Sequence, residues 1–107
     1  MAIVPTEAGT QRLIDAIYGE SDLPDRHLVV PAALWAVVDD LKPTVKGRLS
    51  MTDVIRMRAE GKMTLRAIGR TVGLSPARVS QIEYRALRNL RHPSRRRLYT
   101  THWEIER

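Results

Sequence analysis

The 107-residue sequence predicts an all-α protein, a small helical bundle that contains a helix-turn-helix. Two stretches with helical apolar spacing are separated by a turn at Gly73, and the second begins with Ser75 and Pro76, a typical helix start. Phenylalanine is absent and aromatic residues make up only 5% of the chain, so the core must be mostly aliphatic. A chain of this length is expected to form one small domain, either whole or with extensions around a core.

The first expected helix spans residues 6–20. Its narrow apolar strip consists of Leu13, Ile14, Ile17 and Tyr18. A helix this short needs a surface to pack on. Three such surfaces remain open: the rest of the chain, a second copy in a homodimer formed through residues 6–41, or a subunit of a larger assembly. Residues 19–26 read as a turn-rich linker.

The second expected helix begins at Pro31, after a short extended segment at residues 27–30, because the residue before a proline avoids the helical region. Its apolar face consists of Leu34, Trp35, Val37, Val38 and Leu41. Asp39 and Asp40 stand near its C-terminus, where acidic residues are mildly unfavourable. Either a basic partner holds them or water does, and we expect water. Residues 42–49 are expected to form a loop.

The third expected helix is capped by Ser50 or Thr52 and ends at Gly61. Val54, Ile55 and Met57 should face inward, and Arg56 and Arg58 outward. A fourth helix runs from Thr64, its N-cap, to Val72, and Gly73 ends it because glycine adopts a left-handed backbone freely. Small Gly69 lets this helix lie close to the next one. These helices and the one that follows make four between Pro31 and Arg91, and the N-terminal helix is a fifth.

The helix after Ser75 has two distinct sides when it is projected at about 100° per residue. The core side consists of Val79, Ile82, Ala86 and Leu90, and the opposite side of Ala77, Gln81, Tyr84, Arg85 and Arg88. Amide, phenol and guanidinium groups on one helix face suit the DNA major groove. The alternative is a solvated basic face on a helical bundle.

Charge is concentrated in the part of the chain that holds this motif. Residues 50–98 carry twelve Lys and Arg and three Asp and Glu, whereas residues 1–49 carry five basic and seven acidic side chains. This coincidence indicates a polyanionic partner. The Ser94–Arg97 run is expected to be a phosphate-contacting arm or a solvated tail. Trp103 near the C-terminus is either docked on the core or an anchor for a partner.

The run GLSPARVSQIEYRALRNLRHPSR resembles region 4, the C-terminal helix-turn-helix domain of bacterial primary-type sigma factors, where the form RQIE-x-x-ALRKLRHPSR ends the motif. Leu49–Thr52 and the helix after it are similar to the start of that region, as are Thr64–Leu65 and Ile68–Gly69. The resemblance covers about Leu49 to Arg97. It implies an N-terminal extension at residues 1–30, a region 4-like domain at 31–97 and a tail at 98–107.

The resemblance implies two binding surfaces, one for promoter DNA at the −35 element and one for the β flap of bacterial RNA polymerase. Pro76, Ala77 and Ser80 replace charged residues of the family, so only Gln81 remains of the usual base readers. DNA contacts are expected from Thr64, Ser75, Ala77, Arg78, Ser80, Gln81, Tyr84, Arg85 and Arg88. Phosphate contacts are expected from Arg56, Arg58, Arg70, Arg95 and Arg96, and polymerase contacts from Trp35, Leu87, Leu90 and Leu98.

No catalytic or metal-ligating constellation is found in the sequence, and no cofactor is expected. The three histidines are scattered and the chain has no cysteine. Without a long apolar run we expect no membrane span, and a cytoplasmic, nucleoid-associated protein. Three functions remain open: a sigma region 4-like transcription regulator, a polymerase- or sigma-binding appropriator or anti-sigma-like protein that reads little DNA, and a dimeric helix-turn-helix repressor. So short a chain also fits a phage or mobile-element origin.

Overall fold

Seven helical segments make up the computed structural model, which describes residues 5–19, 23–41 and 49–101. In chain order they are α1 (Glu7–Tyr18), η1 (Arg26–Leu28), α2 (Pro31–Asp39), α3 (Met51–Ala59), α4 (Leu65–Val72), α5 (Pro76–Arg91) and α6 (Pro93–Tyr99). Within these ranges the only β-type pairing is an isolated antiparallel bridge between Val29 and Thr100. The predicted all-α fold is confirmed. Residues 42–48 of the expected 42–49 loop, part of the 19–26 linker and Trp103 lie outside the described residues.

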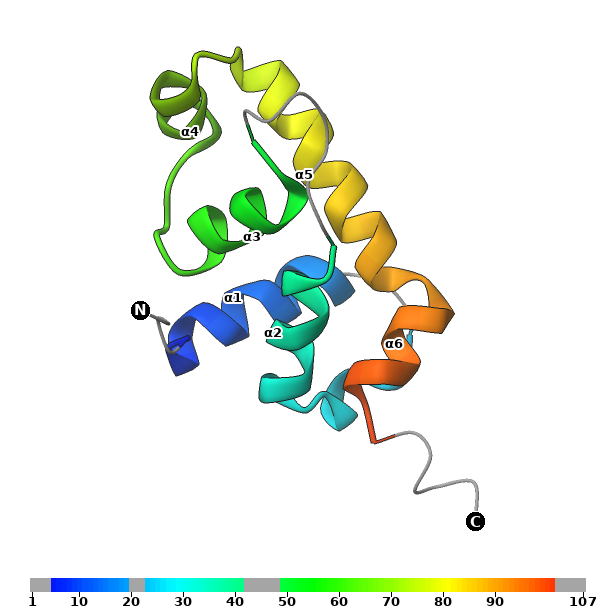
Figure 1. Ribbon diagram of the computed structural model, residues 1–107. Helices are drawn as coiled ribbons and strands as arrows, with labels where there is room; N and C mark the ends of the chain where they lie inside the picture. Colours follow the sequence, from blue (N-terminus) through cyan, green and yellow to red (C-terminus); the bar gives the residue numbers. More distant parts are fainter. Residues whose placement is uncertain (1–4, 20–22, 42–48, 102–107) are drawn as a thin grey trace.

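The long helix α5 joins the two ends of the molecule (Figure 1). At one end α3 and α4 pack against it, and at the other end α1, α2 and α6 gather around its C-terminal half. None of the described helices is long and apolar enough to cross a membrane.

Side-chain caps fix where four of the helices begin. The hydroxyl groups of Thr6, Ser50, Thr64 and Ser75 accept hydrogen bonds from the first-turn backbone N–H groups of α1, α3, α4 and α5. Ser50, and not Thr52, caps α3, because Ser50 and Asp53 form a reciprocal capping box. The Thr52 hydroxyl instead donates to the Val38 carbonyl at 2.6 Å and ties α3 to the end of α2.

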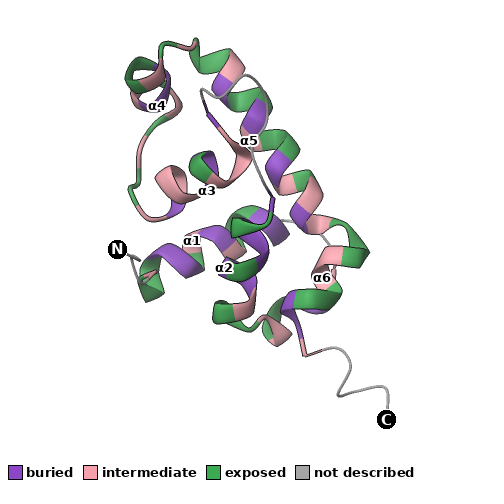
Figure 2. Ribbon diagram, in the orientation of Figure 1, coloured by how far each residue is buried: buried purple, intermediate pink, exposed green. Residues whose placement is uncertain are grey.

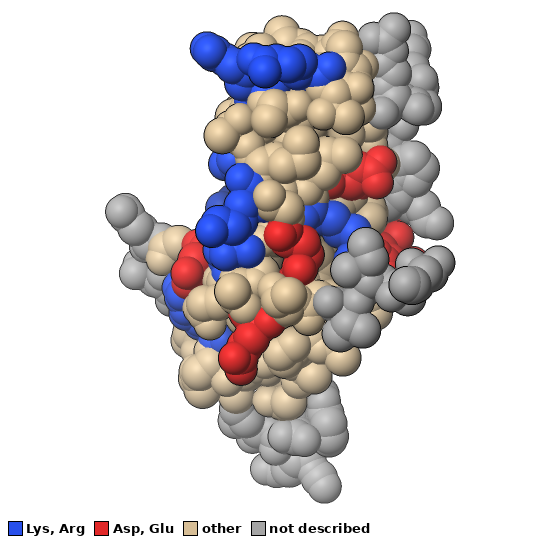
Figure 3. All heavy atoms as spheres, turned by 90° about the vertical axis from the view of Figure 1, so that its left-hand side faces the viewer, with Lys and Arg blue, Asp and Glu red and all other residues tan. Residues whose placement is uncertain are grey.

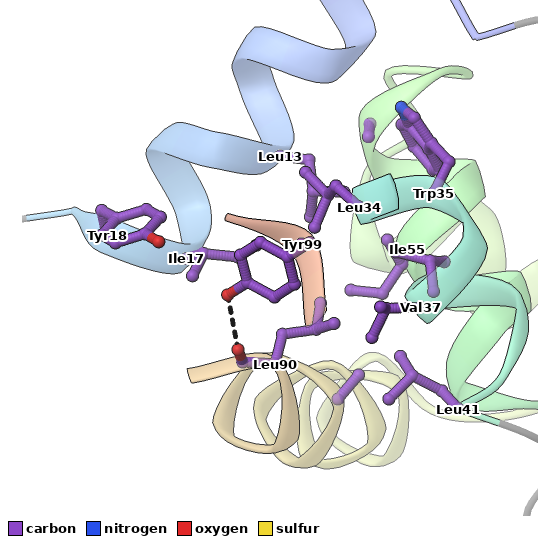
Figure 4. Packing of buried hydrophobic residues seen from close by; sticks show 13 residues of the cluster. Leu13, Ile17, Tyr18, Leu34, Trp35, Val37, Leu41, Ile55, Leu90 and Tyr99 are labelled. Carbon is purple, nitrogen blue, oxygen red and sulfur yellow. Dashed lines mark hydrogen bonds between the residues drawn. The ribbon is translucent and has the colours of Figure 1, made fainter. Parts of the chain in front are cut away.

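The core is divided into two hydrophobic clusters, and α5 contributes to both (Figure 2). The smaller, here the helix-turn-helix cluster, consists of Leu49, Val54, Ile68, Val79 and Ile82. The larger, here the main cluster, draws buried residues from α1, α2, α3, α5 and α6, among them Leu13, Ile17, Leu34, Trp35, Leu90 and Tyr99 (Figure 4). The core stripe predicted for α5 is confirmed, since all four of its residues are buried.

Helix α1 packs on its own chain. Leu13, Ile17 and Tyr18 are buried in the main cluster. The Arg12 Nε donates to the Ala59 carbonyl at 2.7 Å, and the Arg91 Nε donates to the Ile17 carbonyl at 2.6 Å. The apolar strip that a homodimer through residues 6–41 would need is therefore used within the molecule.

The C-terminal prediction was wrong, because Ser94–Arg97 form neither an arm nor a tail but the middle of α6. Two contacts hold this helix in place. The Tyr99 hydroxyl donates to the Leu90 carbonyl at 2.6 Å (Figure 4). The Arg96 Nε lies 3.1 Å from the buried carboxylate of Asp25. Helix α6 is therefore held by the end of α5 and by one side chain far away in the sequence, that of Asp25.

Two smaller expectations near α2 also need correction. Residues 26–28 form the short 3-10 helix η1, so the extended segment is shorter than expected and consists of Val29 and Val30. Asp39 has a protein partner and not water alone, because Arg56 Nη2 lies 2.7 Å from its carboxylate. The Arg56 guanidinium also lies 5.1 Å from the centre of the Trp35 ring, which gives it a cation–π contact.

Candidate nucleic-acid interface

The turn between α4 and α5 is built around two glycines. Gly73 has a left-handed backbone with φ 77°, which a residue with a side chain rarely adopts. The Leu74 N–H donates to the Gly69 carbonyl at 2.8 Å, and a Cβ added at Gly69 would lie only 2.3 Å from the Leu74 carbonyl oxygen. Gly69 therefore lets the turn fold directly onto α4, which sets the position of α5.

The outward side of α5 carries the side chains that were expected to meet DNA. Those exposed to solvent are Ala77, Ser80, Gln81, Tyr84, Arg85 and Arg88, whereas Arg78 is half-buried. The Tyr84 ring is 63% exposed, although it is one of the largest apolar groups on the surface. Thr64 and Ser75 lie at the N-termini of α4 and α5, where their hydroxyl oxygens already accept backbone hydrogen bonds.

One side-chain hydrogen bond lies within this surface. The Arg78 Nη1 donates to the Gln81 Oε1 at 3.1 Å. A carbonyl oxygen accepts two hydrogen bonds, so Gln81 keeps one acceptor position and both of its amide N–H donors. The contact restrains the Gln81 amide without using up its capacity to bind a base.

The basic residues of the second half of the chain divide into two groups. Five arginines bind within the molecule: Arg56 to Asp39, Arg58 to Glu83, Arg78 to Gln81, Arg91 to the end of α1, and Arg96 to Asp25. Others have no side-chain partner among the described residues, and they are Lys62, Arg66, Arg70, Arg85, Arg88, Arg95 and Arg97. Of the five expected phosphate contacts, only Arg70 and Arg95 thus lack an internal partner there.

Helix α4 adds basic side chains that the sequence reasoning partly missed. Arg66 and Arg70 are both exposed, and Lys and Arg side chains form a band over this end of the molecule (Figure 3). Further down the same face, basic and acidic side chains are mixed. Arg66 could have been found from the sequence, because it lies between Leu65 and Ile68 on the side away from their apolar stripe.

The four expected polymerase contacts do not share one surface. Trp35 and Leu90 belong to the main cluster, with 5% and 0% of their surfaces exposed, so no partner can reach them. Leu87 is half-buried and lines a cavity of about 490 Å³ between α1, α3 and α5. Leu98 on α6 is 65% exposed.

The most perturbed titratable groups lie away from this surface, in the main cluster. Burial, aided by the Asp25 charge, raises the pKa of Tyr18 to about 12, and burial also raises the pKa of Tyr99. Asp25 itself is 1% exposed and is paired with Arg96. These groups join η1, α1 and α6, so their role is structural. Among the described residues no cluster of His, Asp and Glu could hold a metal ion.

Known protein families and sequences were compared with this chain, and the matches include the helix-turn-helix formed by α4 and α5. The family model described as Sigma-70, region 4 matches residues 51–92, which run from α3 to just past α5. The RNA polymerase sigma factor SigA of a Nostoc species is 35% identical over 91 residues, covering 78% of this chain and 22% of SigA. SigA of Microcystis aeruginosa and SigA of a Synechocystis species match at the same identity, with 20% of their lengths covered.

The chain therefore spans about a fifth of the length of these curated relatives. No solved structure gives a significant match. The matched residues hold the Gly69–Gly73 turn and the whole of the exposed side of α5. Residues 51–92 are therefore similar to region 4 of sigma-70 factors, and they hold a region 4-like helix-turn-helix in α4 and α5.

Proposed function

We propose that this protein is a transcription regulator that binds double-stranded promoter DNA through α5 and contacts bacterial RNA polymerase, and so alters which promoters are used. Region 4 of sigma-70 factors is a DNA-binding, non-enzymatic domain, which supports a transcription-related role without catalysis or a cofactor. The observation that carries the proposal is the exposed side of α5. It lies opposite the buried stripe and bears Arg85 and Arg88 without internal partners among the described residues.

Within this proposal the residues divide by chemistry. Gln81 contacts a base edge, because an amide can both donate to and accept from adenine. Arg88 and Arg85 further along α5, together with Arg66 and Arg70 on α4, bind phosphates, which fix the orientation of the protein on the duplex. The hydroxyl hydrogens of Thr64 and Ser75 are additional phosphate donors at two helix N-termini.

The polymerase contact is proposed from the family and is directed to the β flap. Of the four residues expected to contact polymerase, a partner can reach Leu87 and Leu98, on separate parts of the surface, since Trp35 and Leu90 are buried. The site of action would be the bacterial cytoplasm, on the nucleoid.

A second candidate is a polymerase- or sigma-binding appropriator that reads little DNA. The first turns of α5 favour it, because Pro76, Ala77 and Ser80 are short and uncharged where the outward surface begins. The homodimeric repressor is not supported, because the apolar side of α1 is buried within the chain.

A salt titration of duplex binding separates these candidates. We expect Arg88→Ala to weaken binding to every sequence and to reduce the slope of log affinity against log salt by about 1, because one phosphate contact is lost. The matched control is Arg56→Ala, which removes an arginine that Asp39 already holds, and should leave the slope unchanged. Wild-type slopes for both variants would refute the α5 interface.

The polymerase contact is tested by capture. Immobilised protein should retain RNA polymerase core enzyme, and removal of the β flap tip should abolish retention. Capture of polymerase without salt-dependent duplex binding would favour the appropriator. Duplex binding without capture would leave a stand-alone DNA-binding protein.

A further inference from the structure

The residues most directly opposite the buried stripe of α5 form one line along the helix. Ala77, Gln81, Tyr84 and Arg88 are spaced by four, three and four residues, so at 3.6 residues per turn they fall within about 60° of one another. All four are exposed. This line, here the outer line, is the part of α5 that would lie deepest in a major groove.

The first three residues of the outer line carry no charge. A glutamine pairs with adenine through its N7 and N6 groups, and apolar side chains contact the C5-methyl group of thymine. Guanine, in contrast, is read mainly by a paired guanidinium contact. The chemistry of Ala77, Gln81 and Tyr84 therefore matches A·T pairs.

Two of the guanidinium groups near Gln81, those of Arg78 and Arg88, are placed for other tasks, whereas the exposed Arg85 lies beside the outer line and is assigned to phosphate in the proposed function. Arg78 is half-buried on the flank of the helix, and its Nη1 already donates to Gln81 Oε1. Arg88 lies seven residues beyond Gln81, about 10 Å further along the axis, where a straight helix leaves the curved groove and reaches the backbone.

We propose that α5 specifies A·T base pairs, with Gln81 on adenine, Ala77 and Tyr84 on thymine methyl groups, and Arg78 positioning the Gln81 amide. This inference rests on the proposed function and adds the class of DNA site. Arg78 is a positioning residue, because its hydrogen bond leaves one lone pair of Oε1 and the amide N–H groups directed at the base.

The experiment starts from duplexes selected from a random pool by the full chain, followed by single-atom changes in the selected site. Uracil in place of one thymine removes only the methyl group, and we expect about a fourfold loss of affinity, the value of one buried methyl. Replacing one adenine by 7-deazaadenine removes the N7 acceptor and should cost about tenfold, within the range for an amide–adenine pair. The matched control is 7-deazaguanine in place of guanine, which should have no effect.

Variants assign each effect to a residue. Gln81→Ala should bind weakly and become insensitive to 7-deazaadenine, and Tyr84→Ala should become insensitive to uracil at one thymine. Arg78→Met keeps most of the stem but cannot hold the Gln81 amide. It should lower the 7-deazaadenine effect while leaving the uracil effect intact, which a general loss of folding would not do.

Two outcomes would overturn the inference. Selection of guanine-rich sites whose affinity falls with 7-deazaguanine would show that Arg85 or Arg78 reads guanine. Salt-dependent binding with no sequence preference and no analogue effect would show that α5 reads no base. Both results would leave the proposed DNA binding standing, whereas absence of any salt-dependent duplex binding would overturn the proposed function as well.

Discussion

The two ends of α5 use arginine in opposite ways. On α4 and the outward side of α5, Arg66, Arg70, Arg85 and Arg88 have no side-chain partner among the described residues. Near the main cluster, Arg91 donates to two carbonyls at the end of α1, and Arg96 pairs with Asp25. Arg88 and Arg91 are separated by less than one helical turn, so the difference is in the acceptors around them and not in the helix.

This contrast shows that the net charge of a segment overstates the charge that is available to bind a partner. The basic excess of residues 50–98 indicates a polyanionic partner, yet four of its arginines hold the fold together. Of the arginines left for a partner among the described residues, four lie on α4 and α5, and Arg95 and Arg97 lie on α6. The main-cluster end instead uses buried polar contacts, including the Trp35 indole N–H that donates to Thr10 at 2.9 Å. In the proposed function, the α4–α5 end binds DNA, and the buried contacts of the other end mainly stabilise the fold.

The largest effect should come from breaking the buried pair at the main-cluster end. The side chains of Asp25 and Arg96 are 2% and 14% exposed, so Arg96→Met leaves a buried carboxylate without its partner. We expect the free energy of unfolding in urea to fall by about 3–5 kcal/mol. The control is Arg26→Ala, which breaks a pair with Asp15 whose side chains are 42% and 55% exposed, and should cost at most about 1 kcal/mol.

DNA binding adds a second measurement to this test. At temperatures where the Arg96→Met protein is still folded, its salt slope on duplex DNA should equal that of the wild type, because Arg96 faces Asp25. A reduced slope would mean that Arg96 contacts phosphate, as the sequence had suggested, and that the two ends are not separate in function.

The second-largest loss of stability should come from a substitution in the helix-turn-helix. Gly69→Ala places a Cβ against the Leu74 carbonyl oxygen, a backbone atom that cannot move without reshaping the turn. We expect a loss of about 1–3 kcal/mol in the free energy of unfolding, together with weakened DNA binding. Arg70→Ala, one residue later and exposed, should leave stability unchanged and only lower the salt slope. Equal stability of wild type and Gly69→Ala would contradict the close approach.

The same contrast separates what could be predicted from the sequence from what could not. The helix-turn-helix is specified locally: Thr64, Gly73 and Ser75 act within a few residues of themselves, and each has its predicted role. The apolar periodicity of α5 also predicted its buried and exposed sides. Local patterns were sufficient there because no distant partner was needed.

The main-cluster end depends on contacts between residues far apart in the chain. Arg96 pairs with Asp25, and Arg91 donates to the end of α1, in both cases more than 70 residues away. A run of arginines after Pro93 gives no local sign of these partners, so the run was expected to be an arm or a tail. Trp35 and Leu90 were also assigned to a partner surface, because the sequence alone does not distinguish an apolar side chain in the core from one in an interface.

The smallest effect concerns the two buried tyrosines of the main-cluster end. The Tyr99 hydroxyl donates to the Leu90 carbonyl, whereas the Tyr18 hydroxyl is buried with no hydrogen-bond partner among the described residues. Tyr99→Phe should therefore lower the free energy of unfolding by about 1 kcal/mol near neutral pH. Tyr18→Phe should leave it within about 0.5 kcal/mol of the wild type, because no made hydrogen bond is lost.

Alkaline pH sharpens the difference between these variants. Because burial raises the pKa of Tyr18 to about 12 from an ordinary 10.0, the folded state holds a phenol proton that the unfolded chain releases. This contribution to stability is complete below pH 10.0 and is lost as the pH rises through about 12. Tyr18→Phe should lose less stability than the wild type across that window, as followed by urea unfolding and by tyrosinate absorbance. If both proteins lost the same free energy of unfolding over this pH range, Tyr18 would ionise as readily in the folded as in the unfolded chain. The main-cluster end would then be more open to water than its packing indicates.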